Sequence, residues 1–311
     1  MVIQNIAAPT PVATRRRRAG RQRRGWIGWI LTAPFGAVFI AFLVVPLGYA
    51  LWMSLRTNSL IGGDRWVGGD NYLKAVQDPL FLKGVVLVIG FTLVLVPIQM
   101  LVSLSAALVL DSLTSRFAKV SRLIIFVPYA VPAVIGALMW GFLYSPNFGP
   151  LKDLFSLFGA DAPDLLSSGN VFGALVNIVT WQWAGYYMII IYAALKGIDP
   201  TVYEAAKLDG ASAWQIALRI KVPMVSSALV LILVFAIIGT LQFFTEPQTL
   251  RPIAGGSIDA AYTPNMYAYS TAFSYGQFNY ALAISFVLGA VVFIGSAIFM
   301  TATRKRSGIT E

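Results

Sequence analysis

Charged residues divide this chain into a few long uncharged stretches, which cover 25–55, 84–110, 123–151, 165–195, 222–245 and 260–303. Each is longer than the ~20 residues that an α-helix needs to cross the bilayer core. The first half of the last stretch is rich in hydroxyl and amide side chains, so only about 281–301 is apolar enough to span. Trimmed at proline, glycine and charged residues, the pattern predicts six transmembrane helices at about 26–55, 82–110, 121–144, 171–196, 223–244 and 280–303.

Composition supports this interpretation. Of 311 residues 58% are apolar and 12% are charged, whereas about a quarter are charged in soluble domains. We therefore expect an all-α integral membrane protein, with a transmembrane domain at 26–303. The chain has no Cys and no His, which removes thiol chemistry, most zinc sites and the usual general base. We expect no catalytic residue, no metal site and no cofactor bound by this chain.

The basic residues predict the orientation, because Lys and Arg in short loops stay on the cytoplasmic side. If both ends are cytoplasmic, the segments on that side hold 17 of the 23 Lys and Arg residues. The tails at 1–25 and 304–311 and the loop at 198–222 are then cytoplasmic. The run "RRRRAGRQRR" precedes a membrane helix directly, so we interpret it as an anchor that also meets anionic lipid. The alternative, a nucleic-acid-binding arm, is less consistent with that position, and no nucleic-acid partner is expected.

The 198–222 segment is polar and lies between two apolar spans. Asp199 is suited to cap a helix whose first residue is Pro200, and Gly210 is suited to end that helix in a left-handed conformation. We expect Pro223 to begin the next membrane helix. Between them, a second short helix has apolar residues on one side, at Trp214, Ile216, Ala217 and Ile220.

The stretch "YEAAKLDGASAWQIALRIKVP" resembles the EAA loop of importer-type ATP-binding-cassette permeases. The family pattern is Glu-Ala-Ala, three residues, Gly, nine residues, Ile, one residue, Leu-Pro, and Val222 replaces the leucine here. "WVGGDNY", "FVPYAVPAVI" and "ALAISFVLGAVVFI" extend the similarity to carbohydrate permeases of the maltose and glycerol-phosphate type. The outer loop "TLRPIAGGS" departs from the glycine-glycine-proline stretch that many members have in the region expected to contact a binding protein.

This resemblance implies a type I ABC importer permease fold in the bacterial cytoplasmic membrane. The loop would couple to a separate ATPase through Glu204, Ala205, Ala206, Asp209, Gly210, Ile220 and Pro223. The chain has no G-x-x-x-x-G-K-[ST] phosphate loop, so ATP and Mg²⁺ would be bound by partners. The implied partners are two ATPase subunits, a second permease subunit and an extracytoplasmic solute-binding protein.

The resemblance also implies a substrate path, lined by Tyr129, Ala133, Gln182, Trp183, Tyr186, Ala236 and Thr240. Aromatic faces and an amide suit a sugar, and a glutamine within a membrane span needs a partner or water. The alternative is that these side chains are interfacial anchors and helix-packing residues. Prolines at 97, 128 and 132 are compatible with simple kinks or with a role in the path.

The function expected is therefore ATP-driven import of a sugar or oligosaccharide by alternating access. A permease for another solute, such as glycerol phosphate or a polyamine, is an alternative. An anionic cargo would favour Lys or Arg in the spans, and the uncharged stretches contain none. An ion-coupled secondary transporter would favour carboxylates at the midplane, whereas Asp111 and Glu246 fall at expected helix ends. A membrane enzyme has no acid-base pair to support it.

Overall fold

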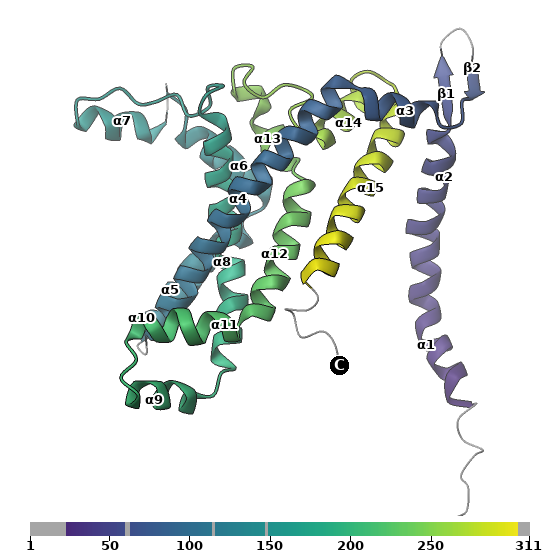
Figure 1. Ribbon diagram of the computed structural model, residues 1–311. Coiled ribbons are helices and arrows are strands. Elements are labelled where there is room, and N and C mark those ends of the chain that lie inside the picture. The colour runs from purple at the N-terminus through teal and green to yellow at the C-terminus, as the bar shows by residue number, and fades with distance from the viewer. Residues whose placement is uncertain (1–22, 60–62, 114–115, 147–148, 304–311) are drawn as a thin grey trace, which may run out of the picture. The chain divides into compact units, whose positions relative to one another are not determined.

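The computed structural model describes residues 23–59, 63–113, 116–146 and 149–303, and their regular structure is predominantly helical. Residues 1–22 and 304–311, which form most of the two expected basic tails, lie outside this range. The chain divides into two compact units, Met1–Trp52 and Met53–Glu311 (Figure 1).

The described part of the first unit belongs to one long helical span, which ends at Ser54. It runs through α1 (Arg23–Phe39), a π-helical turn η1 (Ile40–Val44) and α2 (Val45–Ser54), close to the predicted 26–55. At the end of the turn, the Val45 N–H bonds to the Ile40 carbonyl, five residues back. The next residue, Pro46, has no N–H to offer. A π turn accommodates this local loss of a helix hydrogen bond.

After the end of α2, the second unit has a β-hairpin that the apolar pattern did not predict. Its strands β1 (Arg56–Ser59) and β2 (Gly63–Trp66) are antiparallel, with Arg56 opposite Trp66. The amphipathic α3 (Asp70–Gln77) follows. The remaining elements are α4 (Pro79–Ser112), α5 (Arg116–Ala130), α6 (Ala133–Leu143), α7 (Pro150–Leu157), α8 (Val171–Lys196), α9 (Pro200–Leu208), α10 (Ala213–Ile216), η2 (Ala217–Lys221), α11 (Val222–Met224), α12 (Ser226–Leu241), α13 (Thr245–Leu250), η3 (Arg251–Ile253), α14 (Pro264–Phe273) and α15 (Phe278–Thr303).

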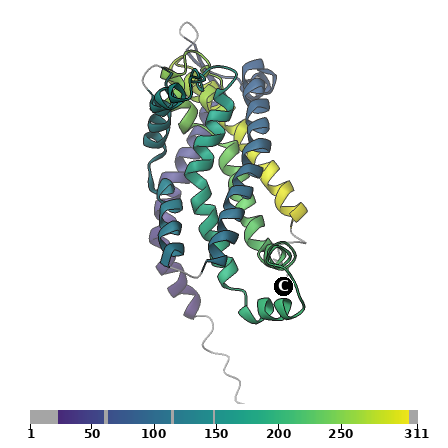
Figure 2. The ribbon, with the colours of Figure 1, turned by 90° about the vertical axis from the view of Figure 1, so that its left-hand side faces the viewer.

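Helix α8 is the centre of this unit. It packs against α4, α5, α6, α12 and α13, and Figure 2 shows it beside α4 along the bundle. Its side chains Leu175, Ile178, Met188 and Ile191 are completely buried or nearly so. Gly185 allows the backbone of α5 to approach closely, as described below. A helix buried on several sides is apolar nearly all round, which explains why 171–196 has little amphipathic pattern.

The prediction of one continuous helix at 121–144 is wrong. Its first part, α5, ends at Ala130, and α6 begins at Ala133, with an angle of 99° between the two pieces. Pro132 precedes α6 with extended backbone angles, φ −55° and ψ 135°. Because a proline has no N–H and disfavours helical torsions in the residue before it, the helix stops at this point. Pro128, in contrast, lies inside α5.

Counting the bent pair as one crossing confirms the predicted six spans. Within the described residues, five helices are long and apolar enough to cross a membrane, and α5 with α6 makes the sixth. The expected start of the fifth span at Pro223 is wrong, since Pro223 lies inside the short α11. Val225 leaves helical geometry there, with ψ 12°, and α12 begins at Ser226.

Candidate functional site

A cavity of about 550 Å³ opens in the second unit, between α8 and the helices around it. It is lined by side chains of α4, α5, α6, α8, α12 and α13 and by the α12–α13 connection. Six of the seven predicted substrate-path residues contribute to this lining: Tyr129, Ala133, Trp183, Tyr186, Ala236 and Thr240. Residues that are up to 111 positions apart in the sequence are therefore brought to one cavity.

Aromatic rings form much of one wall. The Tyr129 ring stacks on that of Tyr186, with centroids 4.5 Å apart and an angle of 17°, and meets the Trp183 ring edge-on at 5.4 Å. Tyr187 extends the cluster, since its ring stacks on Trp183 at 6.0 Å. Rings that pack on one another hold their orientation. The wall therefore offers a fixed aromatic surface, such as sugar C–H faces pack against.

The seventh predicted residue, Gln182, does not line the cavity. Its amide nitrogen donates a hydrogen bond of 3.2 Å to the Val131 carbonyl, between α5 and α6. Its side chain is 5% exposed, and its amide oxygen has no partner among the described residues. The helix break leaves carbonyls that hydrocarbon cannot hydrate. Gln182 satisfies one of them, which accounts for a costly amide within a membrane span.

Gln99, Tyr187 and Glu246 are among the lining residues that sequence reasoning missed. Gln99 lines the cavity from α4 and donates a hydrogen bond of 3.2 Å to the Val179 carbonyl of α8. The argument that singled out Gln182, a lone amide within an apolar stretch, applies equally to Gln99. Glu246, 7% exposed, and Tyr187 also face the cavity. The cavity lining contains this one carboxylate and no Lys or Arg.

The 198–222 segment has the predicted local structure. The Asp199 carboxylate caps α9 by accepting from the Thr201 N–H at 2.9 Å, and Pro200 is the first helical residue. Hydrogen bonds from the Thr201 amide and hydroxyl lower the pKa of Asp199. Gly210 ends the turn with φ +82°, a conformation that L side chains rarely adopt. Ser212 and Gln215 then form a capping box for α10, which the sequence analysis overlooked.

Most predicted coupling residues lie on the surface of this segment. Glu204, Ala205, Asp209, Gly210 and Pro223 are exposed, and Ala206 and Ile220 are half-buried. The expected apolar side of the second helix divides, because Ile216 is buried whereas Trp214 is 72% exposed. Leu208 is 89% exposed. Large apolar side chains exposed outside the membrane spans indicate a contact surface for a partner.

A buried carboxylate fastens this segment to the helix bundle. Asp111, in the last turn of α4, pairs with Lys196 at 2.7 Å and with Lys221 at 2.6 Å. The Lys221 ammonium also lies 4.9 Å from the ring centre of Tyr203 in α9. Burial raises the pKa of Tyr203, and its hydroxyl has no partner among the described residues.

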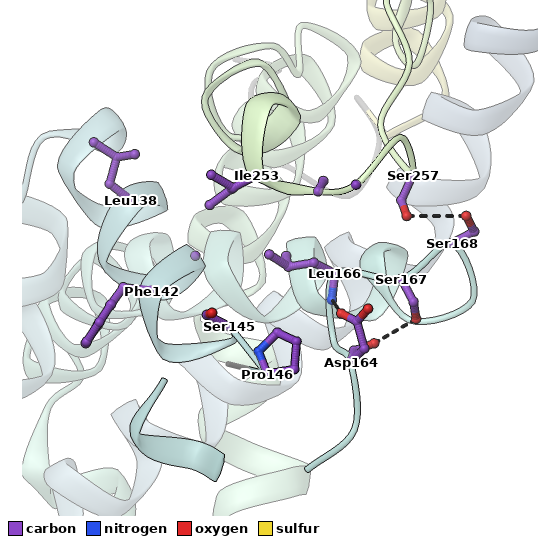
Figure 3. Close-up of a pocket in the computed structure, with 13 residues that line it drawn as sticks. Leu138, Phe142, Ser145, Pro146, Asp164, Leu166, Ser167, Ser168, Ile253 and Ser257 are labelled. Carbon is purple, nitrogen blue, oxygen red and sulfur yellow. Dashed lines mark hydrogen bonds between the residues drawn. The ribbon is translucent and has the colours of Figure 1, made fainter. Parts of the chain in front are cut away.

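A second hollow, of about 590 Å³, lies beside α6 and contains none of the predicted site residues. Leu138, Phe142 and Ile253 form its apolar side, and Figure 3 shows Asp164 and three serines around the other side. Asp164 accepts a hydrogen bond from the Leu166 N–H, and Ser168 donates one to Ser257. No group of three His, Cys, Asp or Glu side chains suited to a metal ion occurs in the described part of the chain.

The sequence of this chain is similar to those of known transport proteins. Residues 99–305 match the family model of the binding-protein-dependent transport system inner membrane component. The lactose transport system permease protein LacF of Rhizobium radiobacter is 30% identical, over 90% of this chain and 94% of its own length. The diacetylchitobiose uptake system permease protein NgcF of Streptomyces coelicolor is 29% identical, over 96% of this chain and 89% of its own.

The fold is shared with a solved structure. A chain from the crystal structure of a bacterial alginate ABC transporter, in complex with an alginate pentasaccharide-bound periplasmic protein, superposes with a TM-score of 0.82. The match has 20% identity and covers 92% of this chain and 96% of that one. The family model covers well over half of the chain. This protein therefore belongs to the family of binding-protein-dependent transport system inner membrane components.

Proposed function

We propose that this chain is the membrane-spanning permease subunit of an ATP-driven importer for a neutral sugar or oligosaccharide. Family membership makes it a transport subunit rather than an enzyme, as the sequence predicted. The observation that carries the sugar assignment is the cavity. It combines an ordered aromatic wall with a few polar groups in a mostly apolar lining, which is the recognition chemistry of a sugar.

The cavity favours a neutral cargo over an anionic one. Its lining contains Glu246 and no Lys or Arg, so nothing there would neutralise a phosphate or a uronate carboxylate. Relatives include permeases named for diacetylchitobiose and lactose as well as for sn-glycerol-3-phosphate. Of these cargo classes, the uncharged disaccharides suit the lining and the glycerol phosphate does not.

The 198–222 segment would connect ATP hydrolysis on a partner to transport through this chain. Its exposed Leu208 and Trp214 give an apolar surface outside the spans, which suits docking into a groove of a cytoplasmic ATPase that binds ATP and Mg²⁺. The distribution of Lys and Arg supports cytoplasmic termini and a cytoplasmic segment. Closure of two ATPase subunits would then open the cavity outward to receive sugar from the binding protein. A second permease would complete the path.

The docking half of this proposal is tested by a paired substitution in affinity-tagged full-length chain. The wild type, purified in mild detergent from its native membrane, is expected to bring an ATP-binding-cassette ATPase with it. Leu208→Glu with Trp214→Glu should abolish that recovery. The control, Leu157→Glu with Phe158→Glu, changes two equally exposed apolar residues at the end of α7 and should leave it intact. Equal recovery with both pairs would contradict docking at the segment.

A further inference from the structure

One carboxylate joins three helical elements at one end of the second unit. Asp111 Oδ1 lies 2.7 Å from the Lys196 Nζ, at the end of α8, and Asp111 Oδ2 lies 2.6 Å from the Lys221 Nζ, in the 198–222 segment. The Asp111 side chain is 5% exposed and that of Lys221 is 14% exposed. The Lys196 side chain is 51% exposed. The pairing therefore spans α4, α8 and the segment, with the carboxylate and one of its two lysines buried.

A carboxylate at position 111 is unfavourable for α4 taken by itself. A negative charge in the last turn of a helix faces the negative end of the helix dipole, which disfavours it. Burial adds a desolvation cost that only partners can offset. The two lysines supply those partners, and Lys196 is itself favoured at the end of α8. The contacts that Asp111 makes with α8 and with the 198–222 segment therefore explain the carboxylate, whereas its position in α4 does not.

The Asp111 cluster contacts both helical parts of the 198–222 segment. Lys221 belongs to the second helical part, and its ammonium lies over the ring of Tyr203 in α9. Ile216 is buried in the same region, and together with Asp111 it lines a pocket of about 470 Å³ between the segment and the bundle. A displacement of the segment would therefore act directly on Asp111.

The helices held at Asp111 also form the cavity. Helix α4 contributes Gln99 to the lining, and α8 contributes Trp183 and Tyr186. The two helices are joined again at the level of the cavity, because the Ser103 hydroxyl donates to the Ala184 carbonyl at 3.0 Å, between Trp183 and Tyr186 in the sequence. Over this stretch buried apolar side chains of α4 and α8 belong to one packed cluster, which includes the cavity-lining aromatic residues of α8 and Tyr203 of the segment. Packed contacts therefore run from the segment to the cavity wall, which is the physical requirement for energetic coupling.

We infer that Asp111 is a positioning residue that locks the 198–222 segment to α4 and α8, so that movement of the segment is passed to the cavity wall. The locking follows from the geometry of the ion pairs alone. The transmission to the cavity rests on the proposed transport function, and the two parts are tested separately.

Thiol labelling tests the lock. Because the chain has no Cys, Ile216→Cys places a single thiol at a site that is 5% exposed, and a maleimide should label it slowly in purified full-length chain. Adding Asp111→Asn removes the charge but not the volume, and labelling should become about tenfold faster or more. Adding Asp111→Glu instead restores the charge and should return the rate to near its original value.

Two controls separate release of the segment from unfolding. Leu208→Cys, already exposed, should label fast and equally with either residue at 111. Ser112→Ala, next to Asp111 and on the surface, should leave the Ile216→Cys rate unchanged. If Asp111→Asn leaves labelling of Ile216→Cys slow, or if Asp111→Glu labels as fast as Asp111→Asn, the carboxylate does not hold the segment and the inference is overturned.

The coupling ratio tests transmission in the importer reconstituted in liposomes with its ATPase. Asp111→Asn should reduce sugar taken up per ATP hydrolysed by about tenfold, with ATP hydrolysis itself largely retained, and Asp111→Glu should recover most of the ratio. A parallel loss of uptake and hydrolysis, at an unchanged ratio, would reduce Asp111 to a structural role. If no sugar is transported by the wild-type complex, the proposed function fails while the labelling result still decides the lock.

Discussion

Gly185 marks the closest approach of two helices that wall the cavity. It lies in the middle of α8, where a Cβ atom would overlap the Ile125 carbonyl oxygen. That Cβ would also lie 2.8 Å from the Ile125 carbonyl carbon and 2.9 Å from the Phe126 Cα. The obstructing atoms belong to the backbone of α5, so no side-chain rotation can relieve the contact. We predict that Gly185→Ala forces α5 away from α8.

The size of the effect follows from the contact distances. Carbon atoms pack best at about 3.5–4.0 Å, so α5 must move by roughly 0.7 Å or more. Forcing one extra methyl group into a packed site typically costs about 1–3 kcal/mol. Because Tyr129 on α5 stacks on Tyr186 on α8, the same shift separates two rings of the aromatic wall. Both stability and substrate handling should therefore suffer.

The matched control is Gly173→Ala in the same helix. A Cβ at 173 would have nothing within 4 Å, so this variant gains the helix propensity of alanine without a clash. Thermal unfolding of the detergent-purified chains and sugar uptake by the assembled importer are the two measurements. We expect Gly185→Ala to melt lower and transport less than the wild type, and Gly173→Ala to do neither. Indistinguishable melting of the two variants would refute the close approach of α5 and α8.

Three further predictions concern polar side chains. Gln182→Leu should lower stability by about 1 kcal/mol, because the carbonyl of the half-buried Val131 loses its donor; unchanged thermal melting would contradict that bond. Glu246→Gln should weaken neutral-sugar uptake by about 1 kcal/mol, roughly a fivefold higher KM, because one carboxyl oxygen is replaced by an amide nitrogen that cannot accept a hydrogen bond; an unchanged KM would exclude Glu246 from sugar contact. Burial raises the pKa of Asp78, but hydrogen bonds from Tyr267, at 2.6 Å, and from other donors outweigh it, so the pKa lies below its ordinary 3.8. The Asp78 carboxylate therefore stabilises the folded chain fully above pH 3.8, and this contribution is lost as the pH falls through the lower pKa of the folded state. The melting temperatures of the wild type and of Asp78→Asn should differ at pH 7 and converge toward pH 3. A difference that stays constant with pH would contradict the lowered pKa of Asp78.

The membrane spans could be predicted from the sequence because apolar length is a local property. The break between α5 and α6 could not, since proline has different consequences in different places. Pro97 and Pro128 lie within continuous helices, whereas Pro132 ends one. A neighbouring donor, Gln182, satisfies a carbonyl at this break, and that contact depends on tertiary packing.

In the candidate site too, some features could be predicted from local sequence and others depend on tertiary packing. The stretch "WQWAGYYM" predicted an aromatic face, and the structure adds Tyr187 to it. Glu246 looked like a charge at a helix end, because the separate short α13 that turns it toward the cavity has no distinct signal in the sequence. Asp111 and Lys221 are 110 residues apart, and no local pattern indicates that they pair.

ATP-dependent sugar uptake is the most direct measurement of the central claim. The importer would be purified through the tagged chain, reconstituted in liposomes with the binding protein outside, and supplied with a radiolabelled neutral disaccharide and with ATP and Mg²⁺ inside. The account predicts uptake that requires ATP and continues when ion gradients are collapsed by ionophores. Uptake by the chain alone, driven by an ion gradient and indifferent to ATP, would contradict it.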